Sequence, residues 1–200
     1  MTPEEKQTLF DEFFTLPMQV TINLQPLSAD QEEPDVEALS EEIPYPFKLA
    51  SQFKQMEQGF SASQQKVQNL NEDVFAYLNM QNRKIDLVLS FLLMQENNNQ
   101  ARYLTETFGA GGLTLITDKN WSLEQIFQLK IFIPEEASAV YCYARIVDKQ
   151  SAASGFIYKL VYSQILEADR EVLVRAALHE QSKQLRALAK KRAEKNNTHE

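Results

Sequence analysis

The chain has little of the chemistry that catalysis or disulfide bonding requires. Among its 200 residues there is one cysteine, so no disulfide can form within the chain, and this predicts a reducing, cytoplasmic setting. Two histidines are present, His179 and His199, and no group of residues has the spacing of a zinc or calcium site. No apolar run is long enough to span a bilayer, and the acidic start of the sequence predicts no secretory leader.

The few reactive side chains do not form a convincing catalytic set. Cys142 and His179 are conceivable as a nucleophile and its base, but Cys142 lies between two tyrosines in a predicted strand. A cysteine in that setting is usually a small core residue. We therefore expect no enzymatic activity, no metal and no resident cofactor.

Basic residues are outnumbered, and their distribution is uneven. The formal net charge is −8, which predicts repulsion from nucleic acids and anionic membranes, so we expect neither a nucleic-acid partner nor membrane insertion. Basic side chains gather between Lys183 and Lys195, where a solvated helix end is favoured over a polyanion site. Residues 28–46 hold seven acidic residues, three prolines and no basic residue. This predicts a solvated connector, and the alternative is an acidic strand that docks on a basic surface.

Residues 47–98 lack proline and contain one glycine, Gly59, which predicts a long helix. Apolar residues recur there at heptad spacing and predict an oligomerisation seam: Phe60, Val67, Leu70, Val74, Leu78, Ile85, Val88 and Leu92. A helix of about 50 residues would extend roughly 75 Å. Either the chain folds back near residues 59–63, or other copies cover the seam. The wide apolar arc between residues 78 and 94 favours a bundle of three or more helices. We expect a homo-oligomer, with a tetramer favoured.

The remaining sequence alternates with the period of β-strands. A short helix ending at Pro17 is expected first, then strands at 18–24, 102–108, 113–117, 129–134, 140–148 and 156–162, and a last helix from Glu167. The predicted fold class is α+β, a small antiparallel β-barrel with a C-terminal helix and a long inserted coiled-coil-like helix. The expected segments are 1–27 (helix and first strand), 28–46 (acidic linker), 47–98 (long helix), 99–166 (barrel) and 167–200 (helix with basic tail).

The glycine-rich stretch Gly109-Ala110-Gly111-Gly112 lies between two predicted strands. It lacks the strand–turn–helix context of a dinucleotide-binding loop and the Gly-Lys-Ser/Thr end of a phosphate loop. We expect its glycines to supply positive φ in a tight turn. The alternative is that its backbone amides form an anion-binding nest.

The order of these segments resembles the PilZ domain family, which are bacterial β-barrel receptors for cyclic di-GMP. The resemblance rests on the ranges 109–113, 131–134, 140–147, 156–160 and 167–173. The inserted helix, with Asn82-Arg83-Lys84-Ile85-Asp86-Leu87 ahead of an apolar run, is similar to an atypical PilZ subgroup of helix-mediated tetramers. The resemblance implies a PilZ-like barrel, a role in cyclic di-GMP-linked signalling, and other signalling proteins as partners.

The sequence departs from the family where the family binds its nucleotide. That binding uses an Arg-x-x-x-Arg segment and an Asp/Asn-x-Ser-x-x-Gly turn. Here Thr107 and Gly109 stand at the first and serine positions of the turn, Gly112 is retained, and no two arginines are four residues apart. Because guanidinium groups both pair with phosphates and stack on bases, we predict an oligomeric adaptor that does not bind the nucleotide tightly. The alternative is a receptor with a rearranged site, whose candidate residues are Arg102, Thr107, Gly109, Gly111, Gly112 and Arg145.

Overall fold

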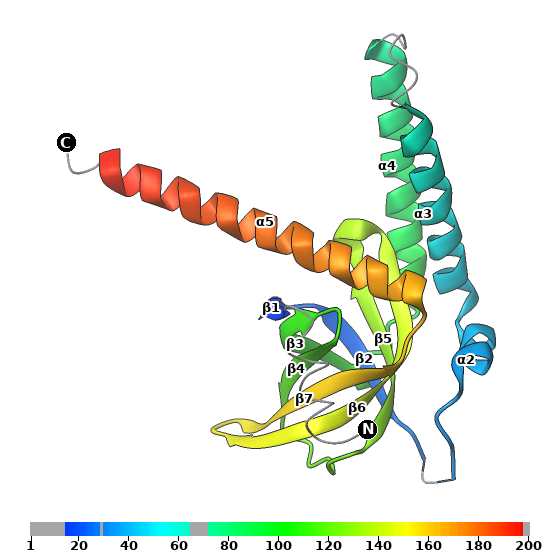
Figure 1. Ribbon diagram of the computed structural model, residues 1–200, viewed down its shortest axis with the longest axis vertical. Helices are drawn as coiled ribbons and strands as arrows, with labels where there is room; N and C mark the ends of the chain where they lie inside the picture. The colour runs from blue at the N-terminus through cyan, green and yellow to red at the C-terminus, as the bar shows by residue number, and fades with distance from the viewer. Residues whose placement is uncertain (1–14, 29, 65–71, 198–200) are drawn as a thin grey trace.

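Figure 1 shows the computed structural model, which describes residues 15–28, 30–64 and 72–197. The predicted helix in residues 1–14 and the seam residues Val67 and Leu70 lie outside the described residues, as does the side chain of Phe60. The principal elements are β1 (Thr15–Pro17), β2 (Thr21–Pro26), α2 (Val36–Glu42), α3 (Tyr45–Gln64), α4 (Glu72–Gln95), β3 (Arg102–Gly109), β4 (Gly112–Thr117), β5 (Ile126–Ile133), β6 (Ser138–Ala152), β7 (Gly155–Gln164) and α5 (Glu167–Asn197).

The strands form a closed six-stranded antiparallel barrel, which confirms the predicted α+β fold. The sheet order is β1-β3-β2-β5-β6-β7-β4, and pairing of β3 with β4 closes the ring. β1 and β2 act as one interrupted strand, because both pair antiparallel with β3. Thr105 bridges the interruption: its Oγ1 accepts from the Val20 amide at 2.9 Å and donates to the Met18 carbonyl at 2.6 Å. The buried hydroxyl thus satisfies backbone groups that the break leaves unpaired.

The barrel interior is filled by alternate side chains of each strand. On β6 the interior residues are Val140, Cys142, Ala144 and Ile146, each fully buried. This is the two-residue period of a strand with one face toward a core. The interpretation of Cys142 as a core residue is confirmed.

The outer face of β5 and β6 is buried as well. Phe132, Tyr141 and Tyr143 point away from the barrel interior and cluster with Leu39 of α2 and Phe47 of α3. The rings of Phe132 and Phe47 meet edge to face, with centroids 5.9 Å apart. Because β6 is covered on both faces, its sequence is a nearly continuous apolar run rather than an alternating one.

Two expectations about the acidic connector and the long helix need correction. The acidic connector contains a helix, α2, whose N-cap Asp35 accepts a hydrogen bond from the Ala38 amide at 2.8 Å. Its prolines, Pro34 and Pro44, stand just outside the two ends of the helix and bound it instead of preventing it. Residues 47–98 form two helices, α3 and α4, in place of one. They lie side by side, joined by an ion pair between Lys54 and Asp86 at 3.5 Å (Figure 1).

The chain therefore folds back on itself between α3 and α4, one of the two possibilities that the heptad pattern left open. The predicted reversal at residues 59–63 is wrong, because α3 continues through them to Gln64. The linking residues 65–71 lie outside the described residues. Near the N-terminus, residues 15–17 belong to β1 and not to the end of a helix, and the strand predicted at 18–24 begins at Thr21.

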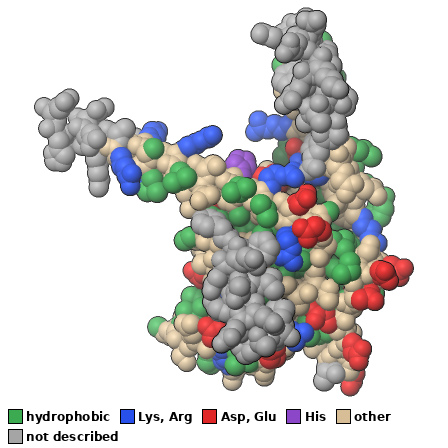
Figure 2. Space-filling view, in the orientation of Figure 1, with side chains coloured by type: hydrophobic (Ala, Val, Ile, Leu, Met, Phe, Trp, Pro, Cys, Tyr) green, Lys and Arg blue, Asp and Glu red, His purple; other side chains and the backbone are tan. Residues whose placement is uncertain are grey.

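Helix α5 crosses one end of the barrel and then projects beyond it (Figure 1). Leu173 and Ala176 are buried against the barrel, whereas Leu178, Leu185 and Leu188 are exposed. Figure 2 shows basic and hydrophobic side chains along the projecting part. No helix in the described ranges combines the length and the hydropathy needed to cross a bilayer.

Candidate functional site

The glycine-rich turn between β3 and β4 is buried beneath the start of α5. Tyr162 of β7 donates its hydroxyl to the Gly109 carbonyl at 3.2 Å, and its amide to the Gly111 carbonyl at 3.1 Å. Arg170 of α5 donates from Nη1 to the Ala110 carbonyl at 2.8 Å. The turn thus offers its carbonyls to the protein interior, which is the wrong polarity for an anion-binding nest.

The conformation of this turn also differs from expectation. Within the described residues, the glycine with positive φ is Gly155, at 129°, in the turn between β6 and β7. The prediction that the glycines at 109–112 supply positive φ is wrong. All four residues of the turn are buried, so small side chains here allow the close approach of α5 and β7.

Arg102 lies at the opposite end of β3 from the glycine turn. Seven residues of extended strand separate it from Gly109, which corresponds to about 23 Å. Its Nε donates to Oδ1 of Asn97 at 3.1 Å, near the base of α4. Arg102 and the glycine turn therefore do not form one site.

Arg145 lies nearer to the turn, on the outer face of β6. It is in register with Val161, which in turn pairs with Gly112. Two strand spacings, about 10 Å in total, therefore separate Arg145 from the turn. Its guanidinium is engaged by carboxylates: Nη2 lies 3.0 Å from Glu33 and Nη1 lies 3.5 Å from Glu124. An anionic ligand at Arg145 would have to displace Glu33.

The reactive side chains do not come together. Cys142 is fully buried in the barrel, and burial raises the pKa of its thiol well above the usual value. His179 lies on the exposed side of α5, with Nδ1 2.8 Å from Oε1 of Glu136. In the described part of the chain no three His, Cys, Asp or Glu side chains are placed to hold a metal ion.

Nine of the nineteen large hydrophobic side chains that are exposed among the described residues lie on α4. One stripe contains the predicted seam residues Val74, Leu78, Ile85 and Val88, all exposed, with Leu92 half-buried at its lower end. At about 100° per residue these positions share one face of the helix. A second stripe, the flank, lies about 130° away around the helix: Met80, Leu87, Phe91 and Met94.

The two stripes together give α4 an apolar arc of about 200° that the rest of the described chain does not cover. Leu87 and Phe91 are each 66% exposed and Val88 is 60% exposed. The opposite face of α4, which contains Leu89 and Leu93, is buried against other parts of the chain. Contiguous exposed surface of this kind is typical of an interaction site.

Comparison with known proteins identifies the fold but no close relative. No protein-family model and no curated protein sequence matches the chain. A solved structure from Xanthomonas campestris, described as a tetrameric PilZ domain that self-assembles through an unusual helical bundle, matches with a TM-score of 0.53. Its sequence identity is 10%, over 91% of this chain and 96% of that one.

The fold is PilZ-like.

A second structure, the Bacillus subtilis inhibitor of motility MotI/DgrA, matches with a TM-score of 0.46 and 11% identity over 86% of this chain. The chain spans about half the length of that protein, 51%.

The turn that was compared with the nucleotide-binding motif of the PilZ family has contacts that can now be described. Thr107, at its acidic or amide position, shares a hydrogen bond of 2.8 Å between its Oγ1 and Oγ1 of Thr114 across the β3–β4 hairpin. Gly109, at its serine position, has no side chain to offer a ligand. Of the predicted ligand residues, the structure brings Thr107, Gly109, Gly111 and Gly112 together, and leaves Arg102 and the guanidinium of Arg145 apart from them.

Several contacts of this PilZ-like barrel were not predicted. Arg170 and Tyr162 hold the glycine turn, and Glu33 and Glu42 bind the outer face of β6. Glu33 is 112 residues from Arg145 in sequence, and Arg170 is 60 residues from Ala110. The alternative that the acidic segment 28–46 docks on a basic surface anticipated the contact of Glu33 with Arg145, although the segment contains a helix and not a strand.

Proposed function

We propose that this chain is a non-enzymatic, oligomeric PilZ-like adaptor in bacterial cyclic di-GMP-linked signalling, which does not bind the nucleotide tightly. The observation that carries the proposal is the uncovered apolar arc of α4. The seam and the flank give it the shape of an assembly surface, and it extends along a pair of helices that projects from the barrel (Figure 1).

The energetics favour covering this surface. Completing the burial of a half-exposed Ile, Leu or Phe gains on the order of 1 kcal/mol. Eight or nine such residues along α4 therefore provide roughly 8 kcal/mol per copy, which competes with the entropic cost of association. Each copy of a bundle both covers its neighbours and is covered by them, so the gain grows with the number of contacts.

The width of the arc favours more than two copies. A helix that pairs with one partner buries a narrow stripe, whereas two stripes about 130° apart contact two neighbours. The tetrameric assembly of the Xanthomonas campestris protein, which is described as a helical bundle, supports a homotetramer here.

The experiment is light scattering coupled to size exclusion on the full chain at micromolar concentration. The wild type is expected at about four times the 23.0 kDa chain mass. The double variant Ile85→Asp/Val88→Asp, which disrupts the seam, is expected to be monomeric. Leu87→Asp/Phe91→Asp, which disrupts the flank, is expected to stop at a smaller oligomer.

Two control variants test whether the effect is specific to α4. Leu123 lies in the loop before β5 and is 56% exposed, so Leu123→Asp removes a comparable side chain from another surface and should leave the mass unchanged. Leu185→Asp/Leu188→Asp places the same charges on the exposed stripe of α5. A monomeric wild type, or dissociation by the α5 pair and not by the seam pair, would refute the proposal.

Nucleotide binding has its own test, a calorimetric titration of the protein with cyclic di-GMP. We expect no saturating heat at low micromolar concentration, because Arg145 is bound to carboxylates and the glycine turn directs its carbonyls toward Tyr162 and Arg170. Saturation in that range would favour the receptor alternative. Arg145→Gln and Arg102→Gln would then show which arginine contributes.

A further inference from the structure

The acidic segment between β2 and α3 runs along the outer face of the barrel. We call residues 30–42, which include α2, the strap. At its start Oε2 of Glu33 binds Nη2 of Arg145 at 3.0 Å. At its end Oε2 of Glu42 accepts hydrogen bonds from the hydroxyls of Tyr143, at 2.6 Å, and Tyr141, at 3.3 Å. Both ends of the strap are therefore fixed to β6 by carboxylates.

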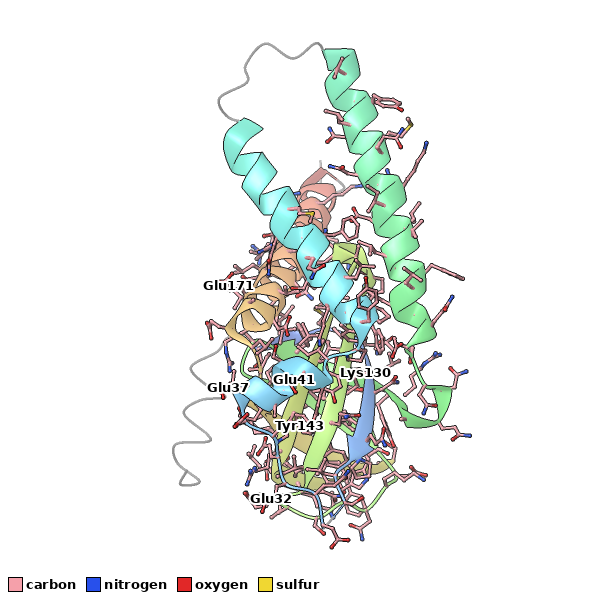
Figure 3. All side chains as sticks on the ribbon, turned by 90° about the vertical axis from the view of Figure 1, so that its right-hand side faces the viewer. Glu32, Glu37, Glu41, Lys130, Tyr143 and Glu171 are labelled. Carbon is pink, nitrogen blue, oxygen red and sulfur yellow. The ribbon has the colours of Figure 1, made fainter. Side chains whose placement is uncertain are left out.

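A single apolar side chain anchors the strap between these contacts. Leu39 is the one buried residue of α2, and it belongs to the cluster that contains Phe132, Tyr141 and Tyr143. Figure 3 shows α2, with Glu37 and Glu41, lying against the strands beside Tyr143. Figure 2 shows acidic side chains gathered on the side of the molecule where α2 and the preceding segment run.

Three features make the strap easy to release. A helix of seven residues is not stable without tertiary contacts, and α2 has one buried anchor. The strap contains seven acidic residues and no basic one, so its charges repel each other. The side chain of Glu33 is 13% exposed, and its Oε1 is buried without a hydrogen-bond donor among the described residues. A buried, unpaired carboxylate oxygen destabilises the closed arrangement.

The surface beneath the strap has the chemistry that an acidic helix requires. Arg145 supplies a cation, the two tyrosine hydroxyls donate hydrogen bonds, and Phe132 contributes to an apolar site for a leucine. A cavity of about 330 Å³ opens beside the strap, lined by Gln25, Gln31, Gln128 and Glu42 among others. The margin of this surface is therefore accessible while the strap is in place.

We propose that the strap is detachable, and that the surface it covers, formed by Arg145, Tyr141, Tyr143 and Phe132, is a docking site for an acidic, leucine-bearing helical segment of a partner protein. The strap occupies the site in the same way from within the chain and keeps it closed until the partner competes. The proposal identifies the surface through which the adaptor binds a partner protein. It rests on the proposed function only for the existence of such a partner.

The test uses the strap's own sequence as the probe. A fluorescent peptide with the sequence of residues 30–46 is titrated into the wild-type protein and into the variant Glu33→Gln/Leu39→Ala, whose strap has lost one carboxylate contact and its anchor. The intact peptide is expected to bind the variant at least tenfold more tightly than the wild type, because the wild-type strap competes at high effective concentration. Equal affinity for both, or no binding to the folded variant, would overturn the proposal.

Two matched controls define the site. A peptide that carries the same two substitutions should bind neither protein. Adding Arg145→Gln to the variant should abolish binding of the intact peptide, since the substitution lies in the docking surface and not in the strap. Binding that survives Arg145→Gln overturns the proposal, and so does a variant that binds cyclic di-GMP but not the peptide.

Hydrogen exchange on the unmodified protein gives a second measurement that does not depend on a variant folding. The amides of residues 36–42 are expected to exchange at least a hundredfold faster than those of β6, because strap opening needs no barrel unfolding. Exchange of α2 as slow as that of β6 would refute a detachable strap. Light scattering separates this proposal from the oligomer proposal, because Glu33→Gln/Leu39→Ala should keep the wild-type mass. Dissociation of that variant would place the assembly on this surface and overturn the docking proposal.

Discussion

Two apolar surfaces of this molecule have similar side chains but different surroundings. The outer face of β5 and β6 is covered by α2, α3 and α4, and its phenylalanine, Phe132, is 2% exposed. The outer face of α4 has no cover among the described residues, and its phenylalanine, Phe91, is 66% exposed. The covered surface stabilises the fold of one chain, whereas the uncovered one is available to hold separate chains together.

The matched pair Phe132→Ala and Phe91→Ala provides the strongest test of this difference. Phe132→Ala is expected to lower the free energy of unfolding by about 3–5 kcal/mol, because it leaves a cavity beside Phe47. Phe91→Ala should change the stability of a dissociated chain by less than about 0.5 kcal/mol. Urea unfolding at two protein concentrations measures both. Equal losses that do not depend on concentration would show that the α4 surface is covered within the chain.

The junction of α5 with the barrel should make the stability of the folded chain depend on pH. Asp169, in the first turn of α5, is 8% exposed, and burial raises its pKa from 3.8 to about 6. The folded state therefore binds this proton more tightly than the unfolded state. Its contribution to stability is complete below about pH 4 and is lost as the pH rises through 6, by about 3 kcal/mol at most.

Asp169→Asn removes the titrating group and should flatten this part of the stability profile between pH 4 and 7. The variant should also be more stable than the wild type at pH 8, because no charge is then buried. Thermal unfolding across this pH range measures the effect. The seam residues do not titrate, so an equal pH dependence of the oligomer mass would argue against an apolar interface.

A set of asparagines connects the end of α4 to β2 of the barrel. Asn23 of β2 donates from Nδ2 to Oδ1 of Asn97 at 2.9 Å and accepts from the Asn98 amide at 2.7 Å. Asn23→Ala is expected to cost about 2 kcal/mol, since it leaves buried polar groups unpaired. Hydrogen exchange should show the loss first at residues 95–101. Exchange that changes first in β6 would show that Asn23 supports the barrel and not the joint.

The smallest effect is expected from the ion pair between α3 and α4. Asp86→Asn removes the partner of Lys54, and we expect a loss below about 1 kcal/mol because the pair is partly exposed. Chemical denaturation in low and high salt measures it. A larger loss would mean that charge, and not apolar packing, holds the two helices together.

The barrel was predictable from sequence because each strand has a local pattern. The expected strand at 102–108 and the observed β3 (Arg102–Gly109) differ by one residue, since alternation and the glycine turn both mark its ends. The failures occurred where tertiary contacts decide. The acidic, proline-containing segment 28–46 was expected to be a solvated connector, but α2 forms between Pro34 and Pro44 and buries Leu39 against β6.

The candidate sites were less predictable than the fold. A heptad repeat shows that a helix needs a partner but does not show whether that partner is in the same chain, so α3 and α4 were expected as one helix. The carboxylates around Arg145 come from segments far apart in sequence, and no local pattern pairs Glu33 with Arg145. The partners of an arginine thus depend on how distant segments of the chain fold together, which the composition of the sequence does not show.

Closure of the ring has a consequence for how this molecule can meet others. A strand whose backbone groups are all paired cannot template a strand of another chain. Among the described strands, two stretches leave one edge without a strand partner. One is β1, which is three residues long, ends in proline and lies beside α5. The other is the end of β6, residues 147–152, which pairs with β7 alone. The paired length of the ring therefore cannot join edge to edge with another barrel when helices hold several barrels close together. Recognition is left to side chains, which can be changed one at a time without disturbing the backbone ladder.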